Sequence, residues 1–139
     1  MGVKAGWSTP MFHVADVERS IKFYEFLGFE AIDTEGCGPI GWARLHCEGG
    51  GIMLLRAEEG HAVDATAQGV ILYLYVADLE TLREQLIVSG IEVPPIAHPG
   101  YMPSGELSLF DPDGYRVSIG HWGEKEHQAW LKKIGREKV

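Results

Sequence analysis

Apolar residues recur along the chain at two spacings, one typical of helices and one typical of strands. Helical spacing, which places apolar residues on one face, is found in two stretches: Val17, Ile21 and Tyr24 in the first, and Leu79, Leu82 and Leu86 in the second. Strand-like alternation follows each predicted helix, over 29–33, 40–47 and 52–57 and then over 91–97, 105–110 and 115–120. With a strand before each helix, both halves have the order β-α-β-β-β.

The two halves are related by a sequence repeat. The segment Val-Ala-Asp-Val-Glu at 14–18 recurs sixty-two residues later as Val-Ala-Asp-Leu-Glu at 76–80. The expected helix caps recur with it: Asp16 and Asp78 as N-caps, and Gly28 and Gly90 as the left-handed residues that end a helix. Matched caps at both ends of a helix predict two copies of one folding unit.

Two hairpin turns are predicted from their residues. Gly49, Gly50 and Gly51 join two strands in the first half. In the second half the turn is Asp-Pro-Asp-Gly at 111–114, where proline fixes one φ angle and Gly114 permits a positive one.

Alternation also assigns strand residues to two faces. An almost purely aliphatic face is expected to be covered by the helices. The opposite face is rich in aromatic and charged residues, which is typical of a ligand cavity rather than of an ordinary surface. We assign to it Thr9, Met11, His13, Trp42, Arg44, His46, Ile52, Leu54, Arg56, Ile71, Tyr73, Tyr75, Glu106, Ser108, Phe110, Arg116 and Ser118.

Composition narrows the possible partners. The chain has 139 residues, 45% of them hydrophobic, and a net charge of −8. The acidic balance disfavours nucleic acid and anionic membranes as partners, and no apolar run approaches the roughly 20 residues of a membrane span. Cys37 and Cys47 form neither a CxxC nor a zinc pattern, so we expect reduced thiols in a cytoplasmic protein.

Three segments carry a resemblance to a known superfamily. These are Val-Ala-Asp-Val-Glu-Arg-Ser-Ile-Lys-Phe-Tyr-Glu-Phe-Leu-Gly-Phe-Glu at 14–30, its repeat at 76–93, and Asp-Pro-Asp-Gly-Tyr-Arg-Val-Ser at 111–118. Together they resemble the vicinal oxygen chelate superfamily, which includes glyoxalase I, extradiol dioxygenases, methylmalonyl-CoA epimerase and bleomycin resistance proteins. The resemblance covers roughly residues 7–122.

The resemblance implies an α+β fold in which two βαβββ modules curl into a cup that is often completed in a homodimer. We expect a single domain over 1–139, with module 1 at about 7–58, a linker at about 59–68 and module 2 at about 69–122. A short amphipathic helix at about 124–135 would follow.

Metal-dependent members of the superfamily place His, Glu or Gln at four equivalent strand positions. Carried over from the shared motifs, these positions fall on Thr9, Leu54, Ile71 and Ser118. Aliphatic side chains cannot bind a metal, and a neutral hydroxyl is a weak ligand, so the resemblance implies no metal and no other cofactor. A shifted metal site of His13, His46 and Glu106 is the alternative.

The closest resemblance is to the metal-free bleomycin resistance-like proteins, although the loop 101–106 departs from their Tyr-Gly-Met-Arg-Glu pattern. We therefore predict that the cup binds a small aromatic or flat molecule. The predicted ligand-binding residues are His13, Trp42, Arg44, Arg56, Tyr73, Tyr75, Tyr101, Glu106, Phe110 and Ser118.

Two other functions stay open. The first is a superfamily enzyme, lactoylglutathione lyase-like or extradiol dioxygenase-like with a shifted metal site, or a metal-free isomerase, with His13 as the base. The second is a protein-interaction module that uses Trp122 and the helix 124–135, and nothing in the sequence favours it.

Overall fold

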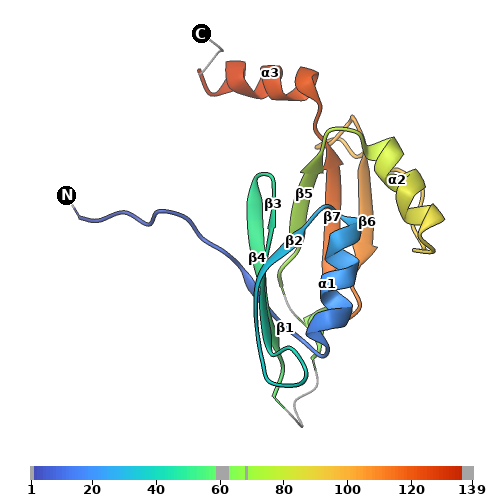
Figure 1. Cartoon of the computed structure of the whole chain (residues 1–139). Coiled ribbons are helices and arrows are strands. Elements are labelled where there is room, and N and C mark those ends of the chain that lie inside the picture. The colour runs from blue at the N-terminus through green and yellow to red at the C-terminus, as the bar shows by residue number, and fades with distance from the viewer. Residues whose placement is uncertain (1, 59–62, 68, 136–139) are drawn as a thin grey trace. The chain divides into compact units, whose positions relative to one another are not determined.

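The computed structural model describes residues 2–58, 63–67 and 69–135, which form two compact units (Figure 1). The first unit takes its residues from 1–68 and also includes the turn 111–114. The second takes its residues from 69–110 and from 115 onward. Both units combine helices with a mixed sheet, so the predicted α+β fold is confirmed.

The first unit consists, in chain order, of β1 (Met11–Val14), α1 (Val17–Phe26), β2 (Glu30–Glu35), β3 (Trp42–Cys47) and β4 (Gly50–Arg56). Its sheet has the order β1-β4-β3-β2, in which β1 pairs with β4 in parallel and the other pairs are antiparallel. Helix α1 contacts β2, β3 and β4. Its buried Phe23 and Tyr24 rings meet edge to face at 5.1 Å between centroids.

The second unit repeats this plan with one strand fewer in its described residues. It consists of β5 (Leu72–Val76), α2 (Leu79–Val88), β6 (Glu106–Phe110), β7 (Arg116–His121) and α3 (Glu124–Lys133). The sheet order is β5-β7-β6, with β5 parallel to β7. Helix α2 contacts β7, and its buried face carries Leu79 and Leu86.

The predicted helix caps are confirmed at both ends of α1 and α2. The Asp16 carboxylate accepts from the backbone N–H of Arg19, and the Asp78 carboxylate accepts from that of Thr81. Each helix ends at a glycine with positive φ, which is 92° at Gly28 and 83° at Gly90. The two halves therefore share their local backbone chemistry as well as their sequence.

The strand predicted over 91–97 is absent from the described residues. This segment makes only an isolated bridge, between Ala97 and Glu106. Pro94 and Pro95 explain the difference, because neither has a backbone N–H to donate to a neighbouring strand. The Pro94 carbonyl instead accepts from the Arg83 side chain at 2.9 Å.

The two faces of strand β4 are exchanged relative to the prediction. The hairpin turn is Glu48–Gly49, and Gly50 and Gly51 already belong to the strand. Register then places Ile52 opposite Leu45 and Leu54 opposite Ala43, and all four are fully or almost fully buried. The even-numbered residues of β4 thus face helix α1.

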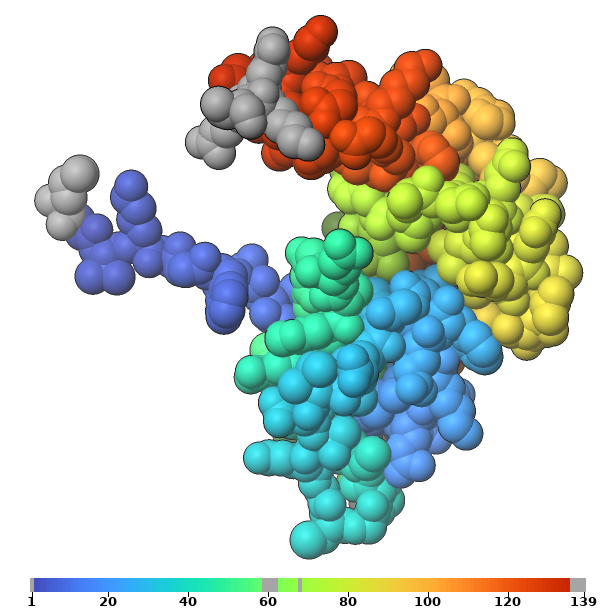
Figure 2. All heavy atoms as spheres, turned by 45° about the horizontal axis from the view of Figure 1, so that its top comes forward, coloured from blue at the N-terminus to red at the C-terminus, as the bar shows by residue number. Residues whose placement is uncertain are grey.

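Other parts of the chain lie outside these sheets. Residues 2–10 form an extended segment in which every residue except half-buried Thr9 is exposed, Trp7 at 93% (Figure 2). Ala65–Ala67 form a 3₁₀ turn within the predicted linker, of which residues 59–62 and 68 lie outside the described residues. In the part of the chain described here, no helix has the length and apolarity to cross a membrane.

The turn 111–114 is held within the first unit by hydrogen bonds to the segment around α1. The buried Tyr24 hydroxyl donates to Asp111 Oδ2 at 2.7 Å. Asp113 Oδ1 accepts from the backbone N–H of Ala15 at 2.9 Å. The predicted positive φ is present at Gly114, at 95°.

Replacing Gly114 with valine is expected to lower the free energy of unfolding by about 1–2 kcal/mol or more, because a branched side chain disfavours positive φ. A Cβ there would meet only the Ala65 Cβ, at 3.9 Å, so backbone strain accounts for the loss. Gly69→Val is the control, because Gly69 lacks a positive φ and has open space around it. Denaturant unfolding of both variants tests this, and equal stabilities would contradict the assigned role of Gly114.

Replacing Tyr24 with phenylalanine is expected to lower the free energy of unfolding by about 1.5–3 kcal/mol, because a buried charged acceptor loses a donor. Tyr75→Phe is the matched control. The Tyr75 ring is 58% exposed, and its hydroxyl makes no hydrogen bond among the described residues. Thermal melts should show a drop only for Tyr24→Phe, and a wild-type melting temperature for it would refute this role.

Candidate functional site

Aromatic side chains form a continuous series on the face of the second sheet that α2 leaves uncovered. The ring centroids of Tyr73 and Tyr75 are 5.2 Å apart, and those of Tyr75 and Trp122 are 5.1 Å apart. Trp122 in turn lies 6.4 Å from Trp130 of α3. Spacings of this size are typical of interacting aromatic pairs. We call Tyr73, Tyr75 and Trp122 the aromatic face.

A buried carboxylate lies beside the aromatic face. Glu106 is only 6% exposed, and each of its two oxygens accepts one tyrosine hydroxyl. Tyr73 donates to Oε2 at 2.5 Å, and Tyr101 donates to Oε1 at 2.8 Å. Among the described residues, no Lys, Arg or His forms an ion pair with Glu106. The carboxylate is therefore satisfied by neutral donors alone.

The two tyrosines keep their protons at ordinary pH. Burial raises the pKa of Tyr73 well above its usual value, and the hydrogen bond to Glu106 and the negative charge of that group raise it further. The hydrogen bond to Glu106 is also the main cause of the raised pKa of Tyr101. Both hydroxyls thus remain donors, which fixes the direction of the two hydrogen bonds.

The loop that carries Tyr101 is closed at its base. Backbone N–H groups of Ala97 and Glu106 donate to each other's carbonyls at 2.9 and 2.8 Å. Within the loop, His98 Nδ1 lies 3.0 Å from the Pro103 carbonyl oxygen. Tyr101 is 70% exposed even though its hydroxyl reaches buried Glu106. Its ring is thus available to a ligand while its tip is held in place.

Gly120 leaves the space that Tyr73 occupies. It pairs with Glu106 across the sheet, and a Cβ added to it would lie 3.0 Å from the Tyr73 hydroxyl oxygen and 2.9 Å from Met102 Cε. Any side chain at this position would push Tyr73 or Met102 aside. The sequence pattern did not indicate either Gly120 or Met102 as part of a site.

Two other predicted ligand-binding residues of the second unit, Ser118 and Phe110, lie at different distances from the aromatic face. Ser118 is buried and pairs with Tyr73, so it lies beneath the aromatic face. Phe110 pairs with Arg116 at the far end of β6 from Glu106, and its ring is 66% exposed. At about 3.3 Å per residue, roughly 13 Å of strand separates Phe110 from Glu106. Phe110 therefore does not join this cluster.

Trp122 was not among the predicted ligand-binding residues, although a signal was available. It continues the alternation of Ser118 and Gly120 beyond the end of β7, and its backbone N–H donates to the Val76 carbonyl at 2.7 Å. The same alternation that selected Tyr73 and Tyr75 would have selected it. Its indole N–H is directed at His127 Nδ1, 3.4 Å away.

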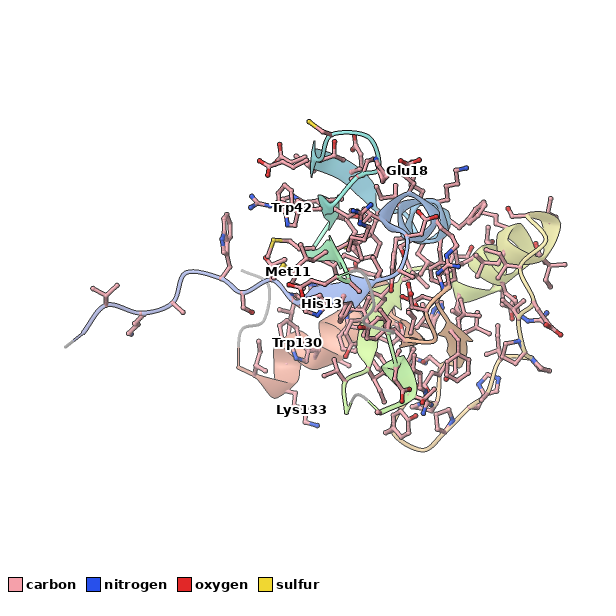
Figure 3. All side chains as sticks on the ribbon, turned by 90° about the horizontal axis from the view of Figure 1, so that it is seen from below. Met11, His13, Glu18, Trp42, Trp130 and Lys133 are labelled. Atoms are coloured by element: carbon pink, nitrogen blue, oxygen red, sulfur yellow. The ribbon has the colours of Figure 1, made fainter. Side chains whose placement is uncertain are left out.

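The first unit has a comparable face, opposite α1. Figure 3 shows Met11, His13 and Trp42, which register places on one side of the sheet together with Leu55. The Arg44 guanidinium carbon lies 5.5 Å from the centroid of the Trp42 ring, within cation–π distance. His13 and Arg44, which the sequence pattern assigned to this face, are both exposed.

Arg56 and Leu54 are not on this face, so their predicted placement was wrong. Both are even-numbered residues of β4, whose helix-facing register was described above. Leu54 is completely buried under α1, and Arg56 pairs with buried Val14. By the same register Met53 pairs with Met11 as Ser118 pairs with Tyr73, so Met53 and not Leu54 is the repeat equivalent of Ser118.

None of these positions forms a cluster of metal-binding groups. Across residues 2–58, 63–67 and 69–135, no three His, Cys, Asp or Glu side chains are placed to hold one ion. Thr9 and Ile71, the other two superfamily positions, precede β1 and β5. In the shifted set, His13 and His46 belong to the first unit and Glu106 to the second, so that set stays a prediction.

Solved structures with the same fold include two bleomycin-related proteins. A bleomycin resistance determinant encoded on the transposon Tn5 is 22% identical, with a TM-score of 0.67, and the match covers 86% of this chain and 99% of that one. A bleomycin-binding protein complexed with bleomycin is 21% identical, with a TM-score of 0.66 and coverage of 85% and 99%.

TnmS3, an antibiotic-binding protein from Streptomyces sp. CB03234, is 20% identical, with a TM-score of 0.62 and coverage of 86% and 98%. At these identities the likeness establishes the fold alone. Among curated proteins, none matches the chain. The sequence model of one superfamily, however, matches residues 9–119, which is most of the chain. The chain therefore belongs to the glyoxalase/bleomycin resistance protein/dioxygenase superfamily.

Proposed function

We propose that this protein binds a small, flat or aromatic molecule on the aromatic face of its second unit, and that it does so without a metal. The observation that carries the proposal is the series of rings from Tyr73 through Tyr75 to Trp122, beside the buried carboxylate of Glu106. Antibiotic-binding and bleomycin-binding proteins of the same fold support a binding role.

The exposure of the rings is what favours a ligand over a structural role. Tyr75 is 58% exposed and Tyr101 is 70% exposed, so their apolar surfaces are not used by the core. A flat molecule stacked on these rings would remove that surface from water and gain aromatic stacking as well. Rigid aromatic side chains lose little conformational entropy when they bind.

Glu106 would orient the ligand. A carboxylate has about four acceptor positions, and the two tyrosine hydroxyls occupy two of them. A ligand N–H or ammonium group at the edge of the aromatic face could take a third. Such a group would also offset the cost of keeping the carboxylate buried.

The helix-free face of the first unit offers similar chemistry, and we include it in the proposal. The Trp42 ring would stack on a ring of the ligand, and Arg44 would meet an anionic group. His13 would contribute a hydrogen bond. We further propose that the protein is a homodimer, as its superfamily resemblance implies, and that it is cytoplasmic, as expected from the pattern of Cys37 and Cys47. Catalysis is not part of the proposal, because Thr9, Met53, Ile71 and Ser118 are poor donors for a catalytic metal.

Tyr73→Ala is expected to weaken ligand binding by about 1–3 kcal/mol, because it removes a stacking ring. The probes are bleomycin, which carries a flat bithiazole and a cationic tail, and ethidium, a flat aromatic cation, both measured by isothermal titration calorimetry. Tyr73→Phe separates the roles, because it keeps the ring but removes the hydroxyl that binds Glu106. Phe110→Ala is the matched control, since Phe110 is an exposed ring on the same face but far from Glu106.

Equal losses for Tyr73→Ala and Phe110→Ala would place the ligand elsewhere. Failure of both probes and of a wider set of planar aromatic compounds to bind the wild-type protein would reject the binding function itself. The expected result is a loss of affinity in Tyr73→Ala, a smaller loss in Tyr73→Phe and no loss in Phe110→Ala.

Gly120→Ala is expected to weaken the same probes and also to lower the free energy of unfolding. The new methyl group would lie 2.9 Å from Met102 Cε and 3.0 Å from the Tyr73 hydroxyl, so Tyr73 would have to move and buried Glu106 would lose a hydrogen-bond donor. Titration calorimetry gives the affinity and a thermal melt gives the stability. Wild-type affinity in this variant would show that the position of Tyr73 does not matter for binding.

A further inference from the structure

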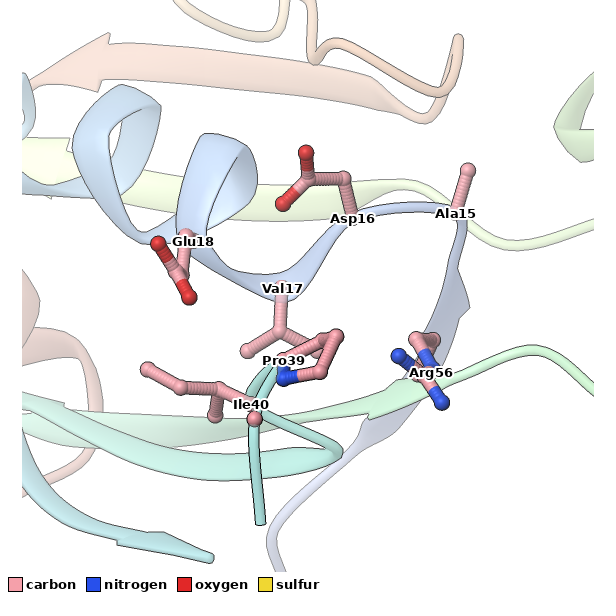
Figure 4. A pocket seen from close by; sticks show the side chains of 8 residues that line it. Ala15, Asp16, Val17, Glu18, Pro39, Ile40 and Arg56 are labelled. Atoms are coloured by element: carbon pink, nitrogen blue, oxygen red, sulfur yellow. The ribbon is translucent and has the colours of Figure 1, made fainter. Parts of the chain in front are cut away.

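A second candidate binding site lies in the first unit, away from its helix-free face. It is a pocket of about 450 Å³ between the start of α1, the loop that joins β2 to β3, and the end of β4 (Figure 4). This volume is in the range of small-molecule sites. The pocket is lined by Ala15, Asp16, Val17, Glu18, Gly38, Pro39, Ile40 and Arg56.

The walls of the pocket are fixed by backbone hydrogen bonds. The Gly41 N–H donates to the Glu35 carbonyl at 2.8 Å, which closes the loop that carries Pro39 and Ile40. The Arg56 N–H donates to the Gly41 carbonyl at 2.8 Å, which ties the end of β4 to the same loop. The pocket is thus formed before any ligand binds.

Opposite charges project from two sides of this pocket. Figure 4 shows Glu18 on one side and Arg56 on the other, with the apolar side chains of Val17, Pro39 and Ile40 between them. Within the described part of the chain, neither the Arg56 guanidinium nor the Glu18 carboxylate makes a hydrogen bond or an ion pair.

We propose that this pocket binds a small zwitterion with an apolar body, such as a free amino acid or a short peptide. Arg56 would receive the carboxylate, because its planar guanidinium can donate two parallel hydrogen bonds to it. Glu18 would receive the ammonium group. Val17 and Ile40 would contact the apolar side chain.

The charges of the pocket disfavour simpler ligands. A plain anion drawn to Arg56 would also meet the negative charges of Glu18 and Asp16. A plain cation drawn to Glu18 would meet Arg56. A molecule that carries both charges satisfies both walls at once. The site is separate from the aromatic face of the second unit, so this proposal stands or falls independently of the proposed function.

The test is a titration followed by two-dimensional ¹H–¹⁵N NMR of the intact protein. The probes are leucine and the dipeptide dileucine, with N-acetyl-leucine, which lacks the ammonium group, and leucinamide, which lacks the carboxylate. Leucine or dileucine should shift the backbone amides of Val17, Glu18 and Ile40, and each singly charged analogue should bind about tenfold more weakly.

Charge-removing variants test the two walls separately. Arg56→Gln and Glu18→Gln should each weaken the zwitterion by about tenfold or more. Both side chains are exposed, so both variants should fold. Lys22→Gln and Glu25→Gln, both farther along α1 and outside the pocket lining, are the control variants that should bind normally.

Three results would overturn the proposal. The first is the absence of amide shifts with both leucine and dileucine at millimolar concentration. The second is equal binding of N-acetyl-leucine or leucinamide, which would show that one of the two charges is not recognised. The third is wild-type affinity in either Arg56→Gln or Glu18→Gln.

Discussion

A carboxylate buried at the edge of a sheet organises the second unit. An ion removed from water is costly unless hydrogen bonds replace its hydration, and Glu106 obtains those bonds from Tyr73 and Tyr101. The requirement fixes a side chain of β5 and a loop residue at one point. It also explains why Gly120, which pairs with Glu106, has no room for a side chain. The position of Tyr73 within the aromatic face is thus a consequence of satisfying one charge.

The first unit solves a similar problem with the turn 111–114. Asp111 and Asp113 accept from a buried tyrosine hydroxyl and from a backbone N–H next to the N-cap of α1. The turn needs a glycine with positive φ, and its two carboxylates need donors on both sides of the start of α1. In both units, then, carboxylates that need particular hydrogen-bond donors determine where a turn or a loop lies.

Much of the fold could be predicted, because caps and turns act locally. Asp16, Gly28 and Gly114 each have a conformation that the residue type strongly favours, and the repeat showed the cap positions twice. The faces of β4 could not be predicted in this way. Its core reads Ile-Met-Leu-Leu, which lacks alternation, so its orientation depends on which residues form the preceding turn.

The site was predicted less completely than the fold, for a related reason. Alternation identified Tyr73, Tyr75 and Glu106 as neighbours on one face, but it gave no sign that Tyr101 would reach the same carboxylate from a loop. Long-range hydrogen bonds of this kind leave no periodic trace in the sequence. Trp122 was omitted because it lies beyond the strand predicted over 115–120, whereas its backbone continues the pairing with β5 one residue past the end of β7 at His121.

The register of β4 determines which of two surfaces of the first unit carries Arg56. A shift of one residue would move Arg56 to the helix-free face of the first sheet, where it would add a second cation beside Arg44. In the observed register Arg56 instead faces the start of α1, across the pocket from Glu18. The same register buries Ile52 and Leu54, whose exposure would cost several kcal/mol of hydrophobic free energy. The core therefore determines the position of Arg56, and the charge pattern of the pocket follows from apolar packing two residues earlier in the same strand.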